Sequence, residues 1–570
     1  MKKLLTGNEA AAQGAYEAGV SVATGYPGTP STEVLEFLMP LSGVYAEWSA
    51  NEKTALEMAS GASFGGKRAL GVMKHVGLNA AADPLMTLSY TGVRAGLVIV
   101  VSDDPGMHSS QNEQDSRLYG RFAKVPVLEP SDSEEALAFT KEAFSISEEF
   151  DIPVIVRLTA AVSHSASLAQ TGRRTAHEIA PWKEPRKYVM LPPYCNERRG
   201  LLEERLRRLK EFSDSFPHNR AEFGSPDTGI VTAGISYQYV KEAFPEASVF
   251  KVSMSYPMPL GAIKEFSKKV KRLSVIEELE PYMEDAIRAG GIEVRGQYPI
   301  SQEAVPPLPH GELSGGQCPL PHGELSVSSI KKSLAGEMPE EGPILGEGGA
   351  FCAGCPYLGV FYCLKRTDCF VFGDIGCYTM GALLFPGSMD TTLCMGAGIS
   401  QAVGFLKARP EGRAFAVIGD STFFHSGIPA VINALHHKTP LPLIILDNGV
   451  TAMTGGQSYA GKEINLKGLL HALGLKDVGE INPYDIKSIS IAIHEALNSA
   501  LPSAIIIKGR CAVKERPKNM AVDPALCDGC MECLELKCPA LVRENGAVAV
   551  RAGCTGCGLC ASVCRRDAVG

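Results

Sequence analysis

AFAVIGDS (residues 414–421) and LPLIILDNGV (residues 441–450) are two apolar runs that each end in small and polar residues. A stretch with helical spacing, Gly427–His437, separates them, so the pattern predicts two parallel strands joined by a helix. Adjacent strands would bring Asp420 and Asn448 to the same edge of a sheet, where α/β domains bind ligands. Carboxylate and amide oxygens suit Mg2+, whose other positions are often filled by phosphates and water. The sequence therefore predicts a magnesium and phosphate site at this edge.

The residues around this edge also suit a diphosphate. Gly419 lets the backbone approach a phosphate, and the start of the following helix adds the positive end of a dipole. Gly-Asp-Ser alone is common in ordinary strand-to-helix turns. Together with Asn448 and the downstream loop Thr454–Gln457, however, the pattern resembles the thiamine-diphosphate motif, with Ser421 in place of its last glycine.

This resemblance implies a set of cofactor contacts. Mg2+, which holds the diphosphate, would be bound by Asp420, Asn448 and the carbonyl of Val450. Further residues expected to contact the cofactor are Gly376, Cys377, Gly419, Ser421 and Thr454.

The N-terminal part of the chain alternates helical windows with short apolar runs, which is typical of a parallel sheet covered by helices. Thiamine enzymes need a second domain whose glutamate hydrogen-bonds the aminopyrimidine ring and so controls the proton chemistry of the cofactor. The stretch Asn51–Ala62 predicts a helix rich in small residues, and Glu52 at its start is the candidate. The alternative is a glutamate that only stabilises the helix dipole.

Eight of the 17 cysteines lie in the last 44 residues. Three thiolates at i, i+3 and i+6 can surround one face of an iron–sulfur cube, and in two-cluster ferredoxins the fourth cysteine of each run ligates the other cluster. We therefore expect one [4Fe–4S] cluster on Cys527, Cys530, Cys533 and Cys564. The second is expected on Cys554, Cys557, Cys560 and Cys538. Such a protein moves electrons one at a time.

Two other interpretations of these cysteines are weaker. Zinc sites would use pairs of C-x2-C, but the third cysteine of each run is superfluous for tetrahedral zinc. A disulfide framework is usual in small secreted domains, whereas the N-terminus lacks the apolar region of a signal peptide. Many free cysteines and thiolate-bound clusters indicate a reducing cytoplasm.

Composition excludes further classes of function. The net charge of −8 and the lack of a basic stripe argue against nucleic-acid binding. No run approaches the ~18 apolar residues of a membrane-spanning helix. With a hydrophobic fraction of 45%, the chain has enough apolar residues for several globular cores.

Several motifs together carry a family resemblance. They are Tyr26–Pro30, the Glu52 helix, Asp420 with Asn448, Cys352–Pro356, Gly373–Tyr378 and the loop Thr451–Gln457. The chain resembles the pyruvate:ferredoxin oxidoreductase superfamily, and within it the family of indolepyruvate:ferredoxin oxidoreductase α subunits. The resemblance covers nearly the whole chain. It implies that Glu52 contacts the pyrimidine and that Thr29 contacts the substrate or the cofactor.

The expected fold class is α/β and multidomain. Two doubly wound parallel-sheet domains that bind thiamine diphosphate are expected at 1–170 and 346–515, and a further α/β domain resembling the C-terminal domain of transketolase at 226–300. A charge-rich connecting segment, expected to contain a solvated helix, covers 171–225. A linker covers 301–345 and contains PLPHGELS twice, at Pro307–Ser314 and Pro319–Ser326, of which one copy is expected to dock between domains. The cysteine-rich residues 518–570 are expected to form a ferredoxin-like domain.

Other residues have both a functional and a structural interpretation. His75 and His108 follow strands of the first domain and are candidates for binding the oxoacid carboxylate or relaying protons, although ordinary loop histidines fit equally. Arg117 and Arg121 suit an anion, but surface arginines are the default. Cys352 and Cys355, with Cys363 and Cys369 nearby, suit another metal site, whereas the resemblance implies that this CxxC loop lies near the thiamine and that Cys377 lines the cofactor.

The resemblance implies a reaction. A 2-oxoacid of the arylpyruvate type reacts with coenzyme A to give arylacetyl-CoA and CO2, and two electrons pass through the clusters to ferredoxin. A β subunit is implied, in a heterodimer or in paired heterodimers. The alternatives are another 2-oxoacid in the same reaction, a non-oxidative 2-oxoacid decarboxylase, and a subunit that only carries electrons.

Overall fold

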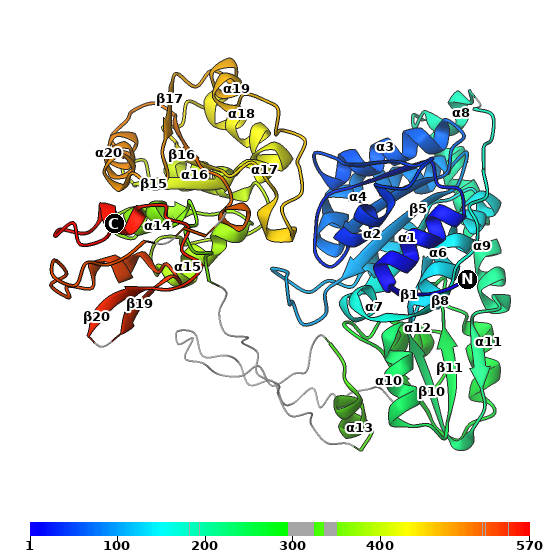
Figure 1. The fold of residues 1–570 in the computed structure, drawn as a ribbon. Coiled ribbons are helices and arrows are strands. Elements are labelled where there is room, and N and C mark those ends of the chain that lie inside the picture. Colours follow the sequence, from blue (N-terminus) through cyan, green and yellow to red (C-terminus); the bar gives the residue numbers. More distant parts are fainter. Residues whose placement is uncertain are drawn as a thin grey trace. The chain divides into compact units, whose positions relative to one another are not determined.

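The computed structural model describes residues 1–181, 183–192, 194–294, 324–335, 350–515, 517–518, 520–544 and 546–570. The chain forms two compact units, Met1–Gly342 and Pro343–Gly570 (Figure 1). The first PLPHGELS copy lies outside the described residues, and the second is described only from Glu324. No helix among these ranges is long and apolar enough to cross a membrane.

The larger sheet of the first unit has seven strands in the order β12-β6-β7-β5-β4-β2-β3, parallel except for β12. Its strands are β2 (Val22–Gly25), β3 (Tyr45–Trp48), β4 (Ala69–Lys74), β5 (Leu97–Asp103), β6 (Val127–Leu128), β7 (Val154–Thr159) and β12 (Met254–Tyr256). Every residue of β4, β5 and β7 is buried, because helices cover both faces of a parallel sheet. The prediction of a parallel sheet in this region is confirmed.

The helices of this sheet connect successive strands. They are α1 (Gly7–Glu17), α2 (Thr32–Leu38), α3 (Glu52–Phe64), α4 (His75–Thr91), α5 (Ser116–Ala123), α6 (Ser133–Phe150) and α7 (Ala160–His164). Two short strands, β1 (Lys2–Thr6) and β8 (Ala166–Gln170), pair antiparallel beside them. Asn51 caps α3 by accepting a hydrogen bond from the amide of Thr54, so Glu52 is the first residue of its helix.

A second sheet in this unit has the order β13-β10-β11-β9. Its strands are β9 (Arg220–Glu222), β10 (Ser225–Ala233), β11 (Ala247–Val252) and β13 (Leu273–Ile276), with helices α10 (Ile235–Ala243), α11 (Leu260–Ser267), α12 (Tyr282–Ala289) and α13 (Val327–Ala335). Because β12 leaves this part of the chain to join the larger sheet, the two sheets are linked through the backbone.

Arg117 is not the surface arginine that the sequence suggested. It is 1% exposed and pairs with Asp115 and with Glu277, which precedes α12. Its guanidinium thus joins the two sheets of the first unit, and two carboxylates offset the cost of burying its charge. Arg121 is exposed, as expected.

The charge-rich segment 171–225 contains α8 (Pro185–Tyr188) and the long helix α9 (Tyr194–Ser215). The expectation of a solvated helix is only partly right. Arg198 and Arg205 of α9 are buried, and both pair with Asp151 at the end of α6. One face of α9 therefore packs on the domain, and the opposite face is exposed to solvent.

The second unit contains a five-stranded parallel sheet with the order β14-β15-β16-β18-β17, as predicted for a parallel domain. Its strands are β14 (Phe370–Phe372), β15 (Ala414–Gly419), β16 (Pro442–Asp447), β17 (Asp477–Ile481) and β18 (Ser503–Lys508). Its helices are α14 (Leu358–Leu364), α15 (Met380–Leu384), α16 (Ala397–Ala408), α17 (Asp420–Thr422), α18 (Ile428–His436), α19 (Leu466–Leu473) and α20 (Ile486–Leu497). A π-helical turn, Phe423–Gly427, separates α17 from α18.

The cysteine-rich end of the chain packs onto this sheet domain. It contains the hairpin β19 (Leu541–Glu544) and β20 (Ala547–Val550) and the short helix α21 (Leu559–Ser562). Leu536 and Leu559 lie in one hydrophobic core with Phe361 of α14 and Ile489 of α20. The cysteines are therefore held by a core that is continuous with the sheet domain.

Candidate active site

The structure brings Asp420 and Asn448 to one edge of the second unit's sheet. The strands β15 and β16 are parallel neighbours, with Gly419 opposite Leu446. The Asp420 carboxylate accepts hydrogen bonds of 2.8 Å from the amides of Ser421 and Gly449. The loop that carries Asn448 is thus hydrogen-bonded directly to Asp420.

Asp420 is 2% exposed, and burial raises its pKa to about 7, with a further contribution from the charge of Asp447. Two neighbouring carboxylates at a buried site repel each other, and a bound divalent cation would reduce this repulsion. Asn448 keeps its carboxamide oxygen bonded to the amide of Val450 at 2.9 Å. The donor set at this edge therefore fits Mg2+.

The loop after β16 is held by side-chain hydroxyls. The hydroxyls of Ser421 and Thr451 lie 3.1 Å apart, and Thr454 donates a 2.6 Å hydrogen bond to Gln457. Gly455 and Gly456 have φ of 121° and 86°, which favours glycine at both positions. Thr454, one of the predicted cofactor contacts, thus forms a hydrogen bond within its own loop.

Gly376 and Gly419 face a common neighbour, the ring of Tyr378. A Cβ at Gly376 would lie 2.4 Å from that ring, and one at Gly419 would lie 2.9 Å from it. Tyr378 is 3% exposed. Both glycines therefore have a packing role that the sequence did not suggest, in addition to any approach to a phosphate.

Four cysteines of the second unit lie within electrostatic range of one another. Burial raises the pKa of the Cys355 thiol, and Cys377, Cys352 and Cys511 raise it further. Burial raises the pKa of Cys377 to about 12, with smaller contributions from Cys511, Cys352 and Asp420. The four thiols therefore lie near one another and near the Asp420 edge.

The sequence suggested Cys363 and Cys369 as partners of Cys352 and Cys355 in a metal site, whereas the structure places Cys377 and Cys511 near them. Cys363 instead lies on α14, with its sulfur 3.8 Å from the carbonyl of Ile486. Cys511 was missed because it is alone in the sequence. The signal that could have found it is its place just after β18, since the ends of neighbouring parallel strands meet at one edge.

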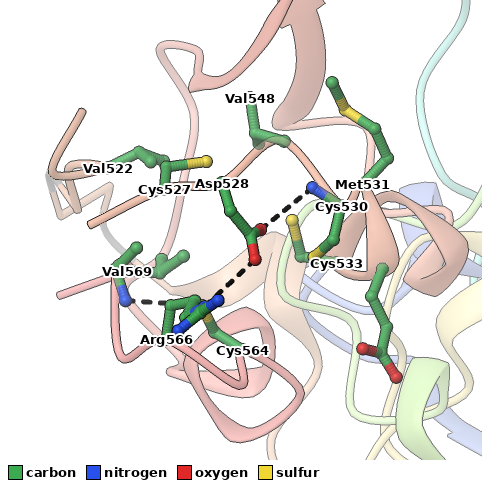
Figure 2. Close-up of a pocket in the computed structure, with 12 residues that line it drawn as sticks. Val522, Cys527, Asp528, Cys530, Met531, Cys533, Val548, Cys564, Arg566 and Val569 are labelled. Atoms are coloured by element: carbon green, nitrogen blue, oxygen red, sulfur yellow. Dashed lines mark hydrogen bonds and ion pairs between the residues drawn. The ribbon is translucent and has the colours of Figure 1, made fainter. Parts of the chain in front are cut away.

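One predicted set of cluster ligands surrounds a single cavity (Figure 2). The cavity is lined by all four cysteines of the set: Cys527, Cys530, Cys533 and Cys564. The amide of Ala568 donates to the sulfur of Cys564 at 3.3 Å, the kind of bond that stabilises a thiolate ligand. Asp528 accepts hydrogen bonds from the amide of Cys530 and from Arg566, both at 3.1 Å.

The other predicted set surrounds a second cavity. Its cysteines are Cys538, Cys554, Cys557 and Cys560. Gly354 from the CxxC loop lines the same cavity and lies so close to Thr555 that a Cβ would be 1.9 Å from its hydroxyl. Each of the two predicted sets of four cysteines thus lines one cavity. No group of three or more His, Cys, Asp or Glu among the described residues is arranged for a single metal ion.

In the first unit, Glu52 begins α3 and is 5% exposed. Its carboxylate packs on the backbone of α4, where a Cβ at Gly77 would lie 2.5 Å from Oε1 and 2.7 Å from Cγ. Only glycine at this position leaves room for the Glu52 side chain. The carboxylate is therefore placed by close packing at the carboxyl edge of the larger sheet.

We expect Gly77→Ala to displace Glu52 and, if Glu52 has the catalytic role expected from the sequence, to lower kcat by about 10²-fold, the effect of a shift of about 1 Å at an active site. Gly61→Ala is the matched control, since Gly61 is exposed on α3 and its Cβ would meet nothing within 4 Å. That change should stabilise the helix by about 0.5–1 kcal/mol and leave kcat unaltered. Steady-state rates and thermal unfolding measure both effects. An unchanged kcat in Gly77→Ala would show that the position of Glu52 does not matter.

The other catalytic candidates lie at the same edge or near it, and His75 is the first residue of α4 rather than a loop residue. The carbonyl of Thr29 accepts a 3.2 Å hydrogen bond from Ser109. His75 is fully buried, its Nε2 lies 3.1 Å from the carbonyl of Asn112, and burial lowers its pKa. It is therefore a neutral imidazole at neutral pH. His108 is exposed and pairs with Glu324, so the described end of the second PLPHGELS copy docks within the first unit.

Comparisons with known proteins add to this geometry. Residues 13–192 match the family described as pyruvate flavodoxin/ferredoxin oxidoreductase, thiamine diP-bdg, and residues 374–507 match thiamine pyrophosphate enzyme, C-terminal TPP binding domain. These two matches fall on the two large parallel sheets.

Relatives align over the full chain. Indolepyruvate oxidoreductase subunit IorA of Archaeoglobus fulgidus is 36% identical over 612 residues, covering 100% of this chain and 97% of the relative. The subunit of the same name from Methanothermobacter thermautotrophicus is 38% identical over 619 residues, again covering 100% and 97%. A solved structure, 2-oxoglutarate:ferredoxin oxidoreductase from Magnetococcus marinus, is 19% identical with a TM-score of 0.44, covering 52% of this chain and 61% of that one.

Proposed function

The chain belongs to the family of indolepyruvate oxidoreductase IorA subunits, and from that premise we propose that it converts arylpyruvates and coenzyme A into arylacetyl-CoA and CO2, passing two electrons through iron–sulfur clusters to ferredoxin. The relatives and the two matched domains make it a thiamine-diphosphate-dependent 2-oxoacid:ferredoxin oxidoreductase. The relatives are named as subunits, which supports a complex with a β partner in a heterodimer or in paired heterodimers.

One observation carries the electron-transfer part of the proposal: within the second unit, the groups of cysteines are neighbours in space. The cavity of Cys527, Cys530, Cys533 and Cys564 lies in the same core as the second cavity. Gly354 connects that second cavity to the loop of Cys352 and Cys355. Cys377 of this third group is close enough to Asp420 for the carboxylate to raise its pKa. Clusters in the two cavities, linked through this third group of thiols to Asp420, would form a route for electrons from the diphosphate edge.

The chain's own residues have defined roles in this proposal. Asp420, Asn448 and the carbonyl of Val450 would hold Mg2+ and, through it, the diphosphate. Glu52 would hydrogen-bond a ring nitrogen of the pyrimidine and move a proton there. When bound, thiamine diphosphate supplies the carbanion chemistry that lets a 2-oxoacid lose CO2.

The test is anaerobic turnover by the chain purified with its β partner. Phenylpyruvate or indolepyruvate is offered with coenzyme A and a ferredoxin or viologen dye. Reduction of the dye that requires both coenzyme A and thiamine diphosphate supports the proposal. Reduction with pyruvate or 2-oxoglutarate but with no arylpyruvate would assign another 2-oxoacid.

Two outcomes point to other functions. CO2 and an aldehyde without dye reduction would identify a non-oxidative decarboxylase. Reduction of the clusters by an added donor, but no turnover of any 2-oxoacid, would leave a subunit that only carries electrons.

A further inference from the structure

Lys74 is a buried cation that the function proposed above does not use. It is the last residue of β4 and is 9% exposed. Its ammonium donates a 3.0 Å hydrogen bond to the carbonyl of Ser109. An ammonium can donate three hydrogen bonds, and this is the one that the structure gives it among the described residues.

The surroundings of Lys74 belong to the carboxyl edge of the larger sheet. The backbone of Gly28 lies over its stem, since a Cβ there would be 3.1 Å from both Cγ and Cδ. The next residue, Thr29, is tied by its carbonyl to Ser109, the same residue that accepts from Lys74. The ammonium is therefore held between the Thr29 loop and the loop after β5.

No carboxylate pairs directly with Lys74 among the described residues. Asp104 is near, but its Oδ2 accepts hydrogen bonds from the Ser109 amide at 2.8 Å and from the Ser110 hydroxyl at 2.6 Å. Glu52 is the other acidic neighbour, and its carboxylate packs on Gly77. A buried ammonium without an ion pair is costly, and a bound anion would offset that cost.

We propose that the ammonium of Lys74 binds the carboxylate of the 2-oxoacid substrate. The proposal rests on the function proposed above, because it assigns a residue to the substrate of that reaction. It places the negative end of the substrate beside Thr29 and within electrostatic range of Glu52. Lys74 would thus select 2-oxoacids over uncharged carbonyl compounds.

The test compares two unreactive ligands that differ in charge, 3-phenylpropionate and 3-phenylpropanamide. Calorimetry on the complex measures the affinity of each for the wild type and for Lys74→Met. We expect the substitution to weaken binding of the carboxylate about 10- to 100-fold and to leave that of the amide unchanged. Lys74→Arg should restore most of the loss, because a guanidinium also binds carboxylates.

Lys67→Met is the matched control. Lys67 precedes the amino end of β4, is 40% exposed and pairs with Glu178, so neither affinity should change. Equal weakening of both ligands in Lys74→Met, or of neither, would overturn the proposal. If the wild type turns over no 2-oxoacid, the proposed function fails, while the two affinities still decide the role of Lys74.

The same assignment predicts a pH dependence. Burial lowers the pKa of Lys74 to about 8, against the opposing charges of Asp104 and Glu52, and the adjacent His75 is neutral in this range. Lys74 is charged below that value, so kcat/KM for an arylpyruvate should fall as the pH rises through about 8. In Lys74→Arg this decline should move to higher pH, because arginine stays charged. An identical profile in both enzymes would contradict the assignment.

Discussion

Glu52→Gln is expected to lower kcat by about 10²- to 10⁴-fold, the usual contribution of a positioned acid or base. Glutamine keeps the size of the side chain and so preserves its packing on Gly77, but it cannot exchange a proton with the pyrimidine. Thiamine diphosphate should remain bound, because the proposed diphosphate contacts lie in the other unit. Steady-state rates and the cofactor content of the purified complex measure the two effects separately.

Glu57→Gln is the control on the same helix. Glu57 is exposed and pairs with Lys53, so its neutralisation should leave kcat within about twofold, as for other surface ion pairs. If Glu52→Gln retained most of its activity, the carboxylate would only stabilise the start of α3, the interpretation that the sequence left open.

The second large effect concerns which cysteines share a cluster. In the crossed grouping, Cys527 and Cys564 belong to one cavity, and Cys554 belongs to the other. The double variant Cys527→Ala/Cys564→Ala should therefore lose one cluster, about four iron atoms per chain. The double variant Cys554→Ala/Cys564→Ala should lose two, about eight iron atoms.

Iron analysis and electron paramagnetic resonance of the anaerobic complex measure these losses. Both variants should lose the reduction of ferredoxin, because the loss of either cluster interrupts the route. The reverse pattern of iron loss would mean that each run of four cysteines holds its own cluster.

Much of the fold could be predicted because parallel sheets have a local signature. Runs such as LVIVVSD in β5 are apolar for their first five residues, and helices cover both faces of such strands. The meeting of Asp420 and Asn448 followed from the same reasoning, since their strands are neighbours in register. Spacing alone also divided the eight cysteines into the two sets that line the two cavities, and their sharing of clusters stays a prediction.

What the sequence could not give depends on contacts between distant segments. Arg117 looks like any surface arginine until Glu277 is brought beside it. Cys511 is alone in the sequence and joins three other thiols only in the folded unit. Lys74 ends a strand as many lysines do, and its burial results from the Gly28 and Ser109 loops that fold over it.

The cysteine-rich end and the sheet domain share one hydrophobic core, which limits how the cysteine-rich end can be removed or replaced by protein engineering. Leu536 and Leu559 fill space against Phe361 and Ile489, so excising the last fifty or so residues would uncover an apolar face on the catalytic half. A foreign ferredoxin fused in their place would have to reproduce that face, not merely the cluster. Loss of iron from the proposed clusters, by oxidation or by iron starvation, should likewise destabilise the thiamine-binding sheet domain, so that catalysis and electron transfer fail together.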